Sequence, residues 1–283
     1  MYRFPERIEL KSPDQIAIMR AAGLVVARAL AAMTAEAAPG VSTGHLDSVA
    51  REVLREAGAT SSFLHYDVGN GPYPAVICSS VNERVVHSIP SDSEKLCDGD
   101  IVSLDFGAIV DGWHGDAAVT VLIGDVDERS QELSEACRRS LWDGLAAARP
   151  NGRLGDISNA VERSVTRSGR YGIVAGYGGH GIGTRMHMDP HVLNYGKAGK
   201  GPRLHPGTCL AIEPMITLGS RATEELDDGW SIATVDGSRA AHWEHTVAIL
   251  ADGPWVLTAE DGGRAELEAR GVALSAAADA DAA

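Results

Sequence analysis

Two aspartates, Asp105 and Asp116, are the residues in this sequence that most clearly predict chemistry. They lie on either side of Asp111-Gly112 in SLDFGAIVDGWHGDAAVTV. Asp-Gly between two alternating apolar runs predicts a two-residue hairpin turn, which places residue 105 opposite 118 and residue 107 opposite 116. Both carboxylates then share one face of the hairpin, where they repel each other unless a cation lies between them. A lone acid at a hairpin is usually a solvated edge charge, but these flanking runs are too apolar to lie open to water. The pair therefore predicts a metal site.

The second half of the sequence offers matching donors. Glu213 lies in LAIEPM, and Glu244 lies in AHWEHTVAIL after a second Asp-Gly pair at 236–237. Each glutamate alone could pair with an arginine, whereas four acids in apolar strands favour a common cation. His180 lies in GYGGHGIG, where glycines allow close backbone approach. Four carboxylates and an imidazole suit two divalent ions with a shared water, for which hydrolysis is the natural reaction.

The remaining motifs do not by themselves predict a functional site. GYGGHG fits a dinucleotide-binding pattern, but GIGTRMHMDP follows it where that motif needs a helix. His87 in VVHSIP, taken alone, is more typical of a hydrogen-bonded core histidine. The four cysteines are widely scattered, which argues against a zinc knuckle and predicts reduced, mostly buried thiols.

The elements that must position these residues occur in the same order twice. A helix starting at Ser12-Pro13-Asp14, a break at Pro39-Gly40, a second helix and then strands make up the first half. A helix near 131–148, a break at 150–152, a further helix and strands make up the second. A shift of 111 residues superposes the two breaks and pairs Gly44 with Gly155. We predict an α+β domain of two related halves with the site between them; two unrelated α/β segments are the alternative.

Composition limits the partners. A net charge of −14 and the absence of a basic stripe argue against a specific nucleic-acid partner. No run approaches the roughly 20 apolar residues of a membrane helix, and the N-terminus lacks a secretory apolar core, so we expect a cytoplasmic protein without membrane contact. We expect an N-terminal segment at 1–11, one domain at 12–262 with halves at about 12–125 and 126–262, and a partly disordered tail at 263–283 because of its low complexity.

Several motifs together resemble the type I methionine aminopeptidases. GVSTGHLD, VNERVVHSIP, SLDFGAIVDGWHGDAAVT, GGHGIGTRMHMDP, LAIEPM and WEHTVAI occur in the family's order between about residues 10 and 260. The resemblance implies the pseudo-twofold pita-bread fold, in which antiparallel strands form a central site and two pairs of helices lie outside. It also departs from the family, because HMDP replaces the commoner HExP and His242 replaces a frequent glutamine.

The resemblance implies a role for each candidate residue. Two divalent ions (Co, Mn, Fe or Zn) would be held by Asp105, Asp116, His180, Glu213 and Glu244, with Asp116 and Glu244 bridging. Glu213 would also shuttle the proton of the attacking water, His187 would donate toward the scissile carbonyl, and His87 would position the peptide nitrogen. The methionine pocket would be lined by Tyr73, Cys78, Met186 and Trp230.

The expected function is hydrolytic removal of the initiator methionine from nascent proteins when the second residue is small. Cotranslational action implies a transient ribosome contact, and we expect a monomer. A proline-specific peptidase of the same fold, and a low-activity or noncatalytic binding paralogue, are the alternatives.

Overall fold

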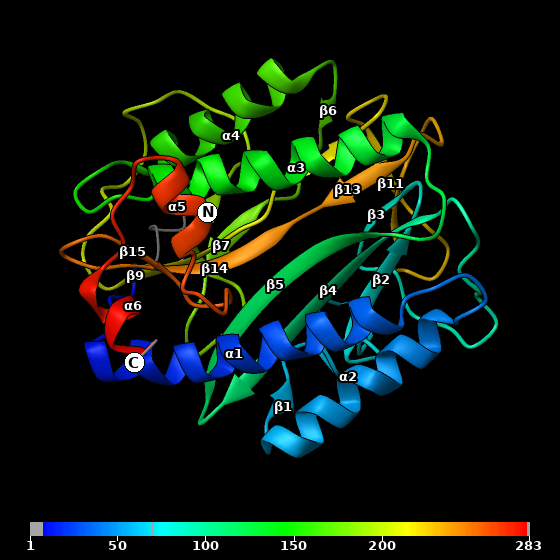
Figure 1. Ribbon diagram of the computed structural model, residues 1–283, viewed down its shortest axis with the longest axis horizontal. Coiled ribbons are helices and arrows are strands. Elements are labelled where there is room, and N and C mark those ends of the chain that lie inside the picture. The colour runs from blue at the N-terminus through cyan, green and yellow to red at the C-terminus, as the bar shows by residue number, and fades with distance from the viewer. Residues whose placement is uncertain (1–7, 70, 282–283) are drawn as a thin grey trace.

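A nine-stranded, largely antiparallel sheet carries the predicted acids, with two pairs of long helices beside it (Figure 1). The computed structural model describes residues 8–69 and 71–281. The sheet runs in the order β1-β4-β5-β14-β9-β7-β8, while β2 pairs with β4 and β15 pairs with β14. Its strands are β1 (Thr60–Ser61), β2 (Ile77–Val81), β4 (Ile101–Val110), β5 (Trp113–Leu122), β7 (Gly179–Gly181), β8 (Met188–Val192), β9 (Thr208–Ile212), β14 (Glu244–Ile249) and β15 (Pro254–Val256).

Two smaller sheets and the helices complete the described part of the chain. One small sheet joins β6 (Gly172–Ile173), β10 (Met215–Thr217) and β13 (Ala240–His242), and the other joins β3 (Arg84–Val86), β11 (Thr223–Glu225) and β12 (Ile232–Thr234). The helices are α1 (Pro13–Glu36), α2 (Thr43–Ala57), α3 (Glu128–Ala147), α4 (Leu154–Ser168), α5 (Arg264–Ala269) and α6 (Ala276–Asp281).

The predicted hairpin forms in the predicted register. β4 and β5 pair so that Asp105 lies opposite Ala118 and Gly107 opposite Asp116. The turn residues Asp111 and Gly112 both have positive φ, at 46° and 80°. A two-residue turn of this kind matches the twist of the flanking strands, which fixes the register and places both carboxylates on one face.

The repeat read from the sequence is present in the structure. α2 and α4 begin and end 111 residues apart, and so do the C-terminal ends of α1 and α3. Gly44 and Gly155 both start their helices against other backbone, since an added Cβ would lie 2.7 Å from Asp92 N and 2.4 Å from Lys197 O, respectively. Each break is therefore followed by the same close approach, in which only glycine fits.

Each helix pair covers its own part of the sheet. α1 packs on β4 and β5, and α2 packs against α1, β1 and β2, whereas α3 and α4 lie on the other side of β14 (Figure 1). The two largest clusters of buried apolar residues divide in the same way, one under α1 and α2 and the other under α3 and α4. Burying each large aliphatic side chain contributes about 2 kcal/mol, so each half has a core that holds its pair of ligand-bearing strands.

Helix α1 corrects one expectation from the sequence. It is long and apolar enough to cross a membrane by length and composition alone, although the sequence suggested that no segment was. Over half of its most apolar window is buried inside the fold, against β4 and β5. In this fold the apolar residues of α1 therefore form one side of the hydrophobic core.

The C-terminal segment also differs from expectation. Residues after 262 were expected to form a partly disordered tail, but the described part contains α5 and α6 and packs on the domain. Leu267 is fully buried in the cluster under α3, and Ala278 is buried near Trp255. A few apolar contacts thus hold the segment after residue 262 against the domain, although its alanine content predicted disorder. The expected N-terminal segment lies largely outside the described residues, because these begin at residue 8.

Arg20 joins α1 to the chain that follows β15. Its guanidinium donates to the carbonyl oxygens of Leu257, Ala259 and Glu260 at 2.8, 2.6 and 2.8 Å. The side chain is buried at 3% exposure, so its charge is held by backbone acceptors rather than by water. The N-terminal helix and the C-terminal segment are thereby tied together.

The second Asp-Gly pair forms a turn but no hairpin. Gly237 N donates to Thr234 O at 3.3 Å, and Gly237 has a φ of 69°. The flanking strands diverge, because β12 pairs with β11 and β3 while β13 pairs with β10. The glutamates of the second half therefore come together through pairing of β9 with β14, not across this turn.

Candidate metal centre and active site

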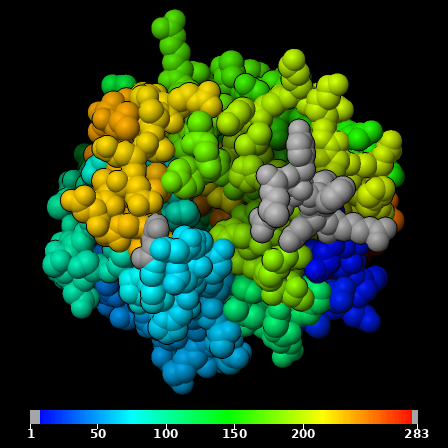
Figure 2. Space-filling model, turned by 180° about the vertical axis from the view of Figure 1, so that it is seen from behind, coloured from blue at the N-terminus to red at the C-terminus, as the bar shows by residue number. Residues whose placement is uncertain are grey.

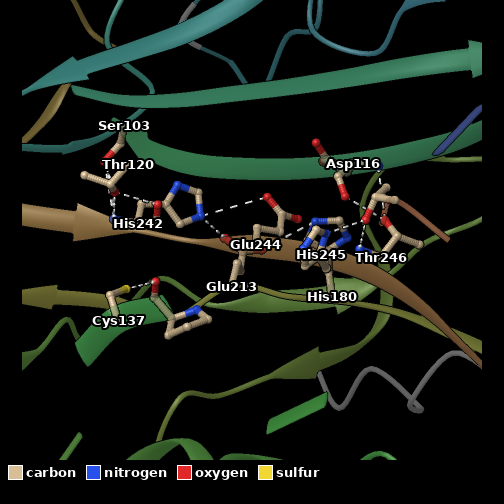
Figure 3. A network of polar contacts seen from close by, with 12 residues as sticks. Ser103, Asp116, Thr120, Cys137, His180, Glu213, His242, Glu244, His245 and Thr246 are labelled. Atoms are coloured by element: carbon tan, nitrogen blue, oxygen red, sulfur yellow. Dashed lines mark hydrogen bonds and ion pairs between the residues drawn. The ribbon is translucent and has the colours of Figure 1, made fainter. Parts of the chain in front are cut away.

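Three side chains from three strands converge at the middle of the large sheet. Asp116 on β5, His180 on β7 and Glu244 on β14 each place a donor atom within 4.8 Å of the others. Figure 3 shows Glu244 and His180 close together, with Asp116 facing them. All three are buried, and Glu244 lies opposite Ala118 of β5, so the group spans the join between the two halves.

The other two predicted donors lie in the same cavity, outside that tight group. Asp105 lines the cavity from β4, and Glu213 lines it directly after β9. Glu213 Oε1 lies 3.5 Å from His180 Nε2. The structure therefore brings all five predicted residues to one place, although they are spread over 140 positions of the sequence.

The carboxylates need a positive partner. Burial and the neighbouring acids raise the pKa of Asp105 and Glu244 well above its usual range, and burial raises the pKa of Asp116 to about 7 and that of Glu213 to about 8. Asp105 Oδ1, Asp116 Oδ1 and Glu244 Oε1 have no hydrogen-bond partner among the described residues. Buried acceptors of this kind fit a divalent cation, which would satisfy them and lower those pKa values.

His180 is oriented as a ligand. Its Nδ1 lies 3.0 Å from the carbonyl oxygen of Gly181, and a carbonyl only accepts, so Nδ1 carries the proton. Nε2, which faces Glu213, is left with its lone pair. Burial lowers the His180 pKa to about 3, so the ring stays neutral and able to bind a cation.

The two candidate catalytic histidines lie at the rim of this acidic group. His187 has its ring centroid 4.4 Å from that of His180 and lines the same cavity. His87 also lines the cavity and packs edge-on against Tyr177, with a left-handed φ of 62° that is uncommon for a non-glycine residue. Burial lowers the pKa of both histidines, to about 4 for His87. Both are neutral at pH 7.

The predicted methionine-pocket residues form one apolar cluster. Tyr73, Cys78 and Met186 are buried together with Phe63, and Trp230 packs edge-on against Tyr73 at 5.0 Å between ring centroids. They bound a cavity of about 210 Å³ whose polar end is the acidic group. In Figure 2, light-blue, gold and yellow-green segments of the chain surround the hollow on this face.

His242 is a site residue that the sequence marked only as a departure. It is buried, and its Nε2 lies 3.9 Å from both Glu213 Oε2 and Glu244 Oε2, as Figure 3 shows. Burial lowers its pKa to about 3, so it is neutral. Thr120 Oγ1 holds its backbone, accepting from His242 N at 3.0 Å. Its place at the end of β13, two residues before Glu244, could have identified it.

Two further cavity residues had no marker in the sequence. Phe63 and Tyr66 lie in the segment after β1 and line the cavity. The Tyr66 hydroxyl oxygen lies 2.6 Å from His187 Nδ1. Tyr66 is 121 positions from His187, the motif residue that it contacts, so no local pattern in the sequence indicated this contact.

Comparison with known proteins agrees with this geometry. The model of metallopeptidase family M24 matches residues 17–251. The chain belongs to metallopeptidase family M24. "Methionine aminopeptidase 1" of Mycobacterium tuberculosis is 54% identical over 253 residues, covering 88% of this chain and 94% of that protein. "Methionine aminopeptidase" of Clostridium acetobutylicum is 44% identical, with coverage of 89% and 98%.

A solved structure extends the comparison to the fold. The crystal structure of methionine aminopeptidase from Thermotoga maritima has a TM-score of 0.86 and 39% identity, and covers 90% of this chain and 100% of that chain. These relatives confirm the resemblance to the type I methionine aminopeptidases and the pita-bread fold. Membership of family M24 and the cluster of Asp116, His180 and Glu244 support the use of a divalent metal.

Proposed function

We propose that this chain hydrolyses the peptide bond after an N-terminal methionine when the second residue is small. The observation that carries the proposal is an apolar pocket with sulfur and aromatic groups that ends at a cluster of buried carboxylates. A thioether packs well against polarizable and aromatic surfaces, so the pocket suits methionine. The acidic end lies where the substrate backbone would then be.

The ligands of the site follow from the donors present. Asp105, Asp116, His180, Glu213 and Glu244 would hold two divalent ions, and the resemblance to the type I methionine aminopeptidases implies that Asp116 and Glu244 would be the shared ligands. Oxygen-rich ligation with one imidazole admits cobalt, manganese, iron or zinc. When bound, such ions lower the pKa of water and stabilise negative charge on oxygen.

Three side chains of the cavity would move protons or donate and accept hydrogen bonds during the reaction. Glu213 lies beside His180 and would accept the proton of the attacking water, then pass it to the leaving nitrogen. His187 would donate a hydrogen bond to the carbonyl oxygen as negative charge develops there. His87, across the cavity, would position the scissile nitrogen. Both histidines are neutral at pH 7, as a hydrogen-bond donor and a positioning group require.

The wider setting follows from the reaction. Removal of an initiator methionine acts on a chain emerging from the ribosome, so the enzyme would work in the cytoplasm and contact the ribosome transiently. A monomer is sufficient, because one chain supplies all the residues of the cavity.

The test is hydrolysis of Met-Ala, Met-Leu and Ala-Pro peptides by protein depleted of metal and reloaded with individual metals. We expect metal-dependent release of methionine from Met-Ala, little from Met-Leu and none from the Xaa-Pro peptide. Glu213→Gln should remove activity, whereas Glu224→Gln, exposed on β11, should not. Preferred cleavage of the Xaa-Pro peptide would replace the proposal with a proline-specific peptidase, and no cleavage by any reloaded protein would indicate a binding paralogue.

A further inference from the structure

Tyr66 holds the side chain of His187 from the rim of the cavity. Its hydroxyl oxygen lies 2.6 Å from His187 Nδ1, and the two rings meet edge-on with centroids 5.2 Å apart. The backbone of Tyr66 is itself fixed, because its N–H donates to Phe63 O at 2.9 Å and its carbonyl accepts from Tyr73 N at 2.8 Å. The phenol is therefore anchored next to the methionine pocket and aimed at one particular ring nitrogen.

The chemistry of the two groups sets the direction of this hydrogen bond. Partial burial raises the pKa of Tyr66, so the phenol keeps its proton at neutral pH. A neutral imidazole has one protonated nitrogen and one lone pair, and the lone pair is a better acceptor than a phenol oxygen. Tyr66 therefore donates, and His187 Nδ1 accepts. The His187 proton must then lie on Nε2.

We infer that Tyr66 is a positioning residue that fixes His187 as its Nε2–H tautomer and so makes it a hydrogen-bond donor. The inference deepens the proposed function, since it rests on His187 donating to the scissile carbonyl. Nδ1 and Nε2 lie on opposite sides of an imidazole, so engaging Nδ1 turns Nε2 away from Tyr66. Among the described residues no hydrogen-bond partner of Nε2 is recorded, which leaves this N–H free for a substrate oxygen.

The neighbouring histidine shows the opposite setting. His180 donates from Nδ1 to the Gly181 carbonyl and keeps a lone pair on Nε2, as a cation ligand needs. His187, whose ring centroid is 4.4 Å away, meets a donor at Nδ1 and keeps a proton on Nε2. The Gly181 carbonyl therefore leaves a lone pair on His180 Nε2, whereas the Tyr66 hydroxyl leaves a proton on His187 Nε2.

The kinetic test is Tyr66→Phe, which keeps the ring and removes the hydroxyl. We expect kcat for Met-Ala to fall about threefold to tenfold, the worth of one neutral hydrogen bond, while KM changes little. Tyr195→Phe is the matched control, because that ring packs on Arg221 away from the cavity. In a His187→Ala background Tyr66→Phe should cause no further loss. Equal losses in both backgrounds would overturn the inference.

The direct test is the tautomer of His187 in zinc-loaded protein labelled with ¹⁵N-histidine. The His187 resonances are assigned by their absence from the spectrum of His187→Gln. We expect Nδ1 to resonate as an unprotonated nitrogen and Nε2 as a protonated one, and we expect Tyr66→Phe to mix the two tautomers. Protonated Nδ1 in the wild-type protein would refute the inference whatever the activity. Unchanged turnover in His187→Ala, with the expected tautomer observed, would instead refute the proposed role of His187.

Discussion

Metal binding at neutral pH should release more than one proton from this chain. The pKa of Asp116 is raised to about 7 and that of Glu213 to about 8, while Asp105 and Glu244 have pKa values well above the usual range. In metal-free protein at pH 7, Glu213 is therefore mostly protonated and Asp116 about half protonated. Carboxylates bind metal only when ionised, so those protons must leave.

Titration calorimetry in two buffers with different ionisation enthalpies measures this number. Glu213→Gln should release about one proton fewer, because its amide has none to lose. Glu224→Gln, whose side chain is exposed on β11, should match the unaltered protein. The number should fall when the titration is repeated at pH 9, since Asp116 and Glu213 are then largely ionised before metal is added. Release of less than one proton at pH 7 would refute the reasoning, because the acids would then be ionised in the metal-free cavity.

The same pKa values give metal-free protein a characteristic stability profile. An acid whose pKa is raised by folding favours the folded state at low pH and loses that contribution as pH rises through the folded pKa. For Asp116 and Glu213 the contribution is complete below about pH 4 and is lost by about pH 8, at about 1.4 kcal/mol per group and pH unit. Urea unfolding of chelator-treated protein should therefore show a lower free energy of unfolding at pH 7.5 than at pH 5.5. Added metal should abolish this trend.

Substitutions at four positions test other parts of the structure. Arg20→Met leaves three backbone carbonyls without their buried donor and should lower the free energy of unfolding by about 3 kcal/mol in urea titrations. Leu267→Ala opens a cavity beneath α5 and should cost about 2–4 kcal/mol in the same assay, whereas a loose tail would show no change. Trp230→Ala removes one wall of the pocket and should raise KM for Met-Ala about tenfold with a smaller effect on kcat. His242→Leu should weaken metal binding in calorimetry, and His242→Gln, which keeps a donor near Glu213, should weaken it less.

The parts of the site that could be predicted from sequence were those controlled by local rules. Asp-Gly with strict alternation on both sides leaves one register for the hairpin, so the relation of Asp105 to Asp116 followed directly. The helices after the two breaks begin with the same glycine requirement, which made the repeat visible. Where a short motif fixes the geometry, residue spacing is sufficient.

The remaining parts depend on long-range packing. Tyr66 and His187 are 121 positions apart, and their contact depends on how the segment after β1 lies over the cavity. The alanine-rich C-terminal segment has few large side chains, so its sequence predicts disorder. In the structure it lies against β15, where the apolar side chains that it does have are buried in apolar clusters. The second Asp-Gly pair forms a turn, but the strands beside it, β12 and β13, diverge into different sheets. In each case the deciding neighbour is distant in sequence.

The join between β5 and β14 has a consequence for how the protein folds and opens. Only two registered pairs, Glu244 with Ala118 and His245 with Ala117, connect these strands, whereas β4 and β5 share ten. Asp105 and Asp116 approach this seam from one half, and Glu213 and Glu244 approach it from the other. The halves can form their own local contacts early, but closing the seam takes four acids out of water into one buried cavity. Because so few registered pairs hold this seam, amide hydrogen exchange along it should be the first to quicken when the protein is destabilised.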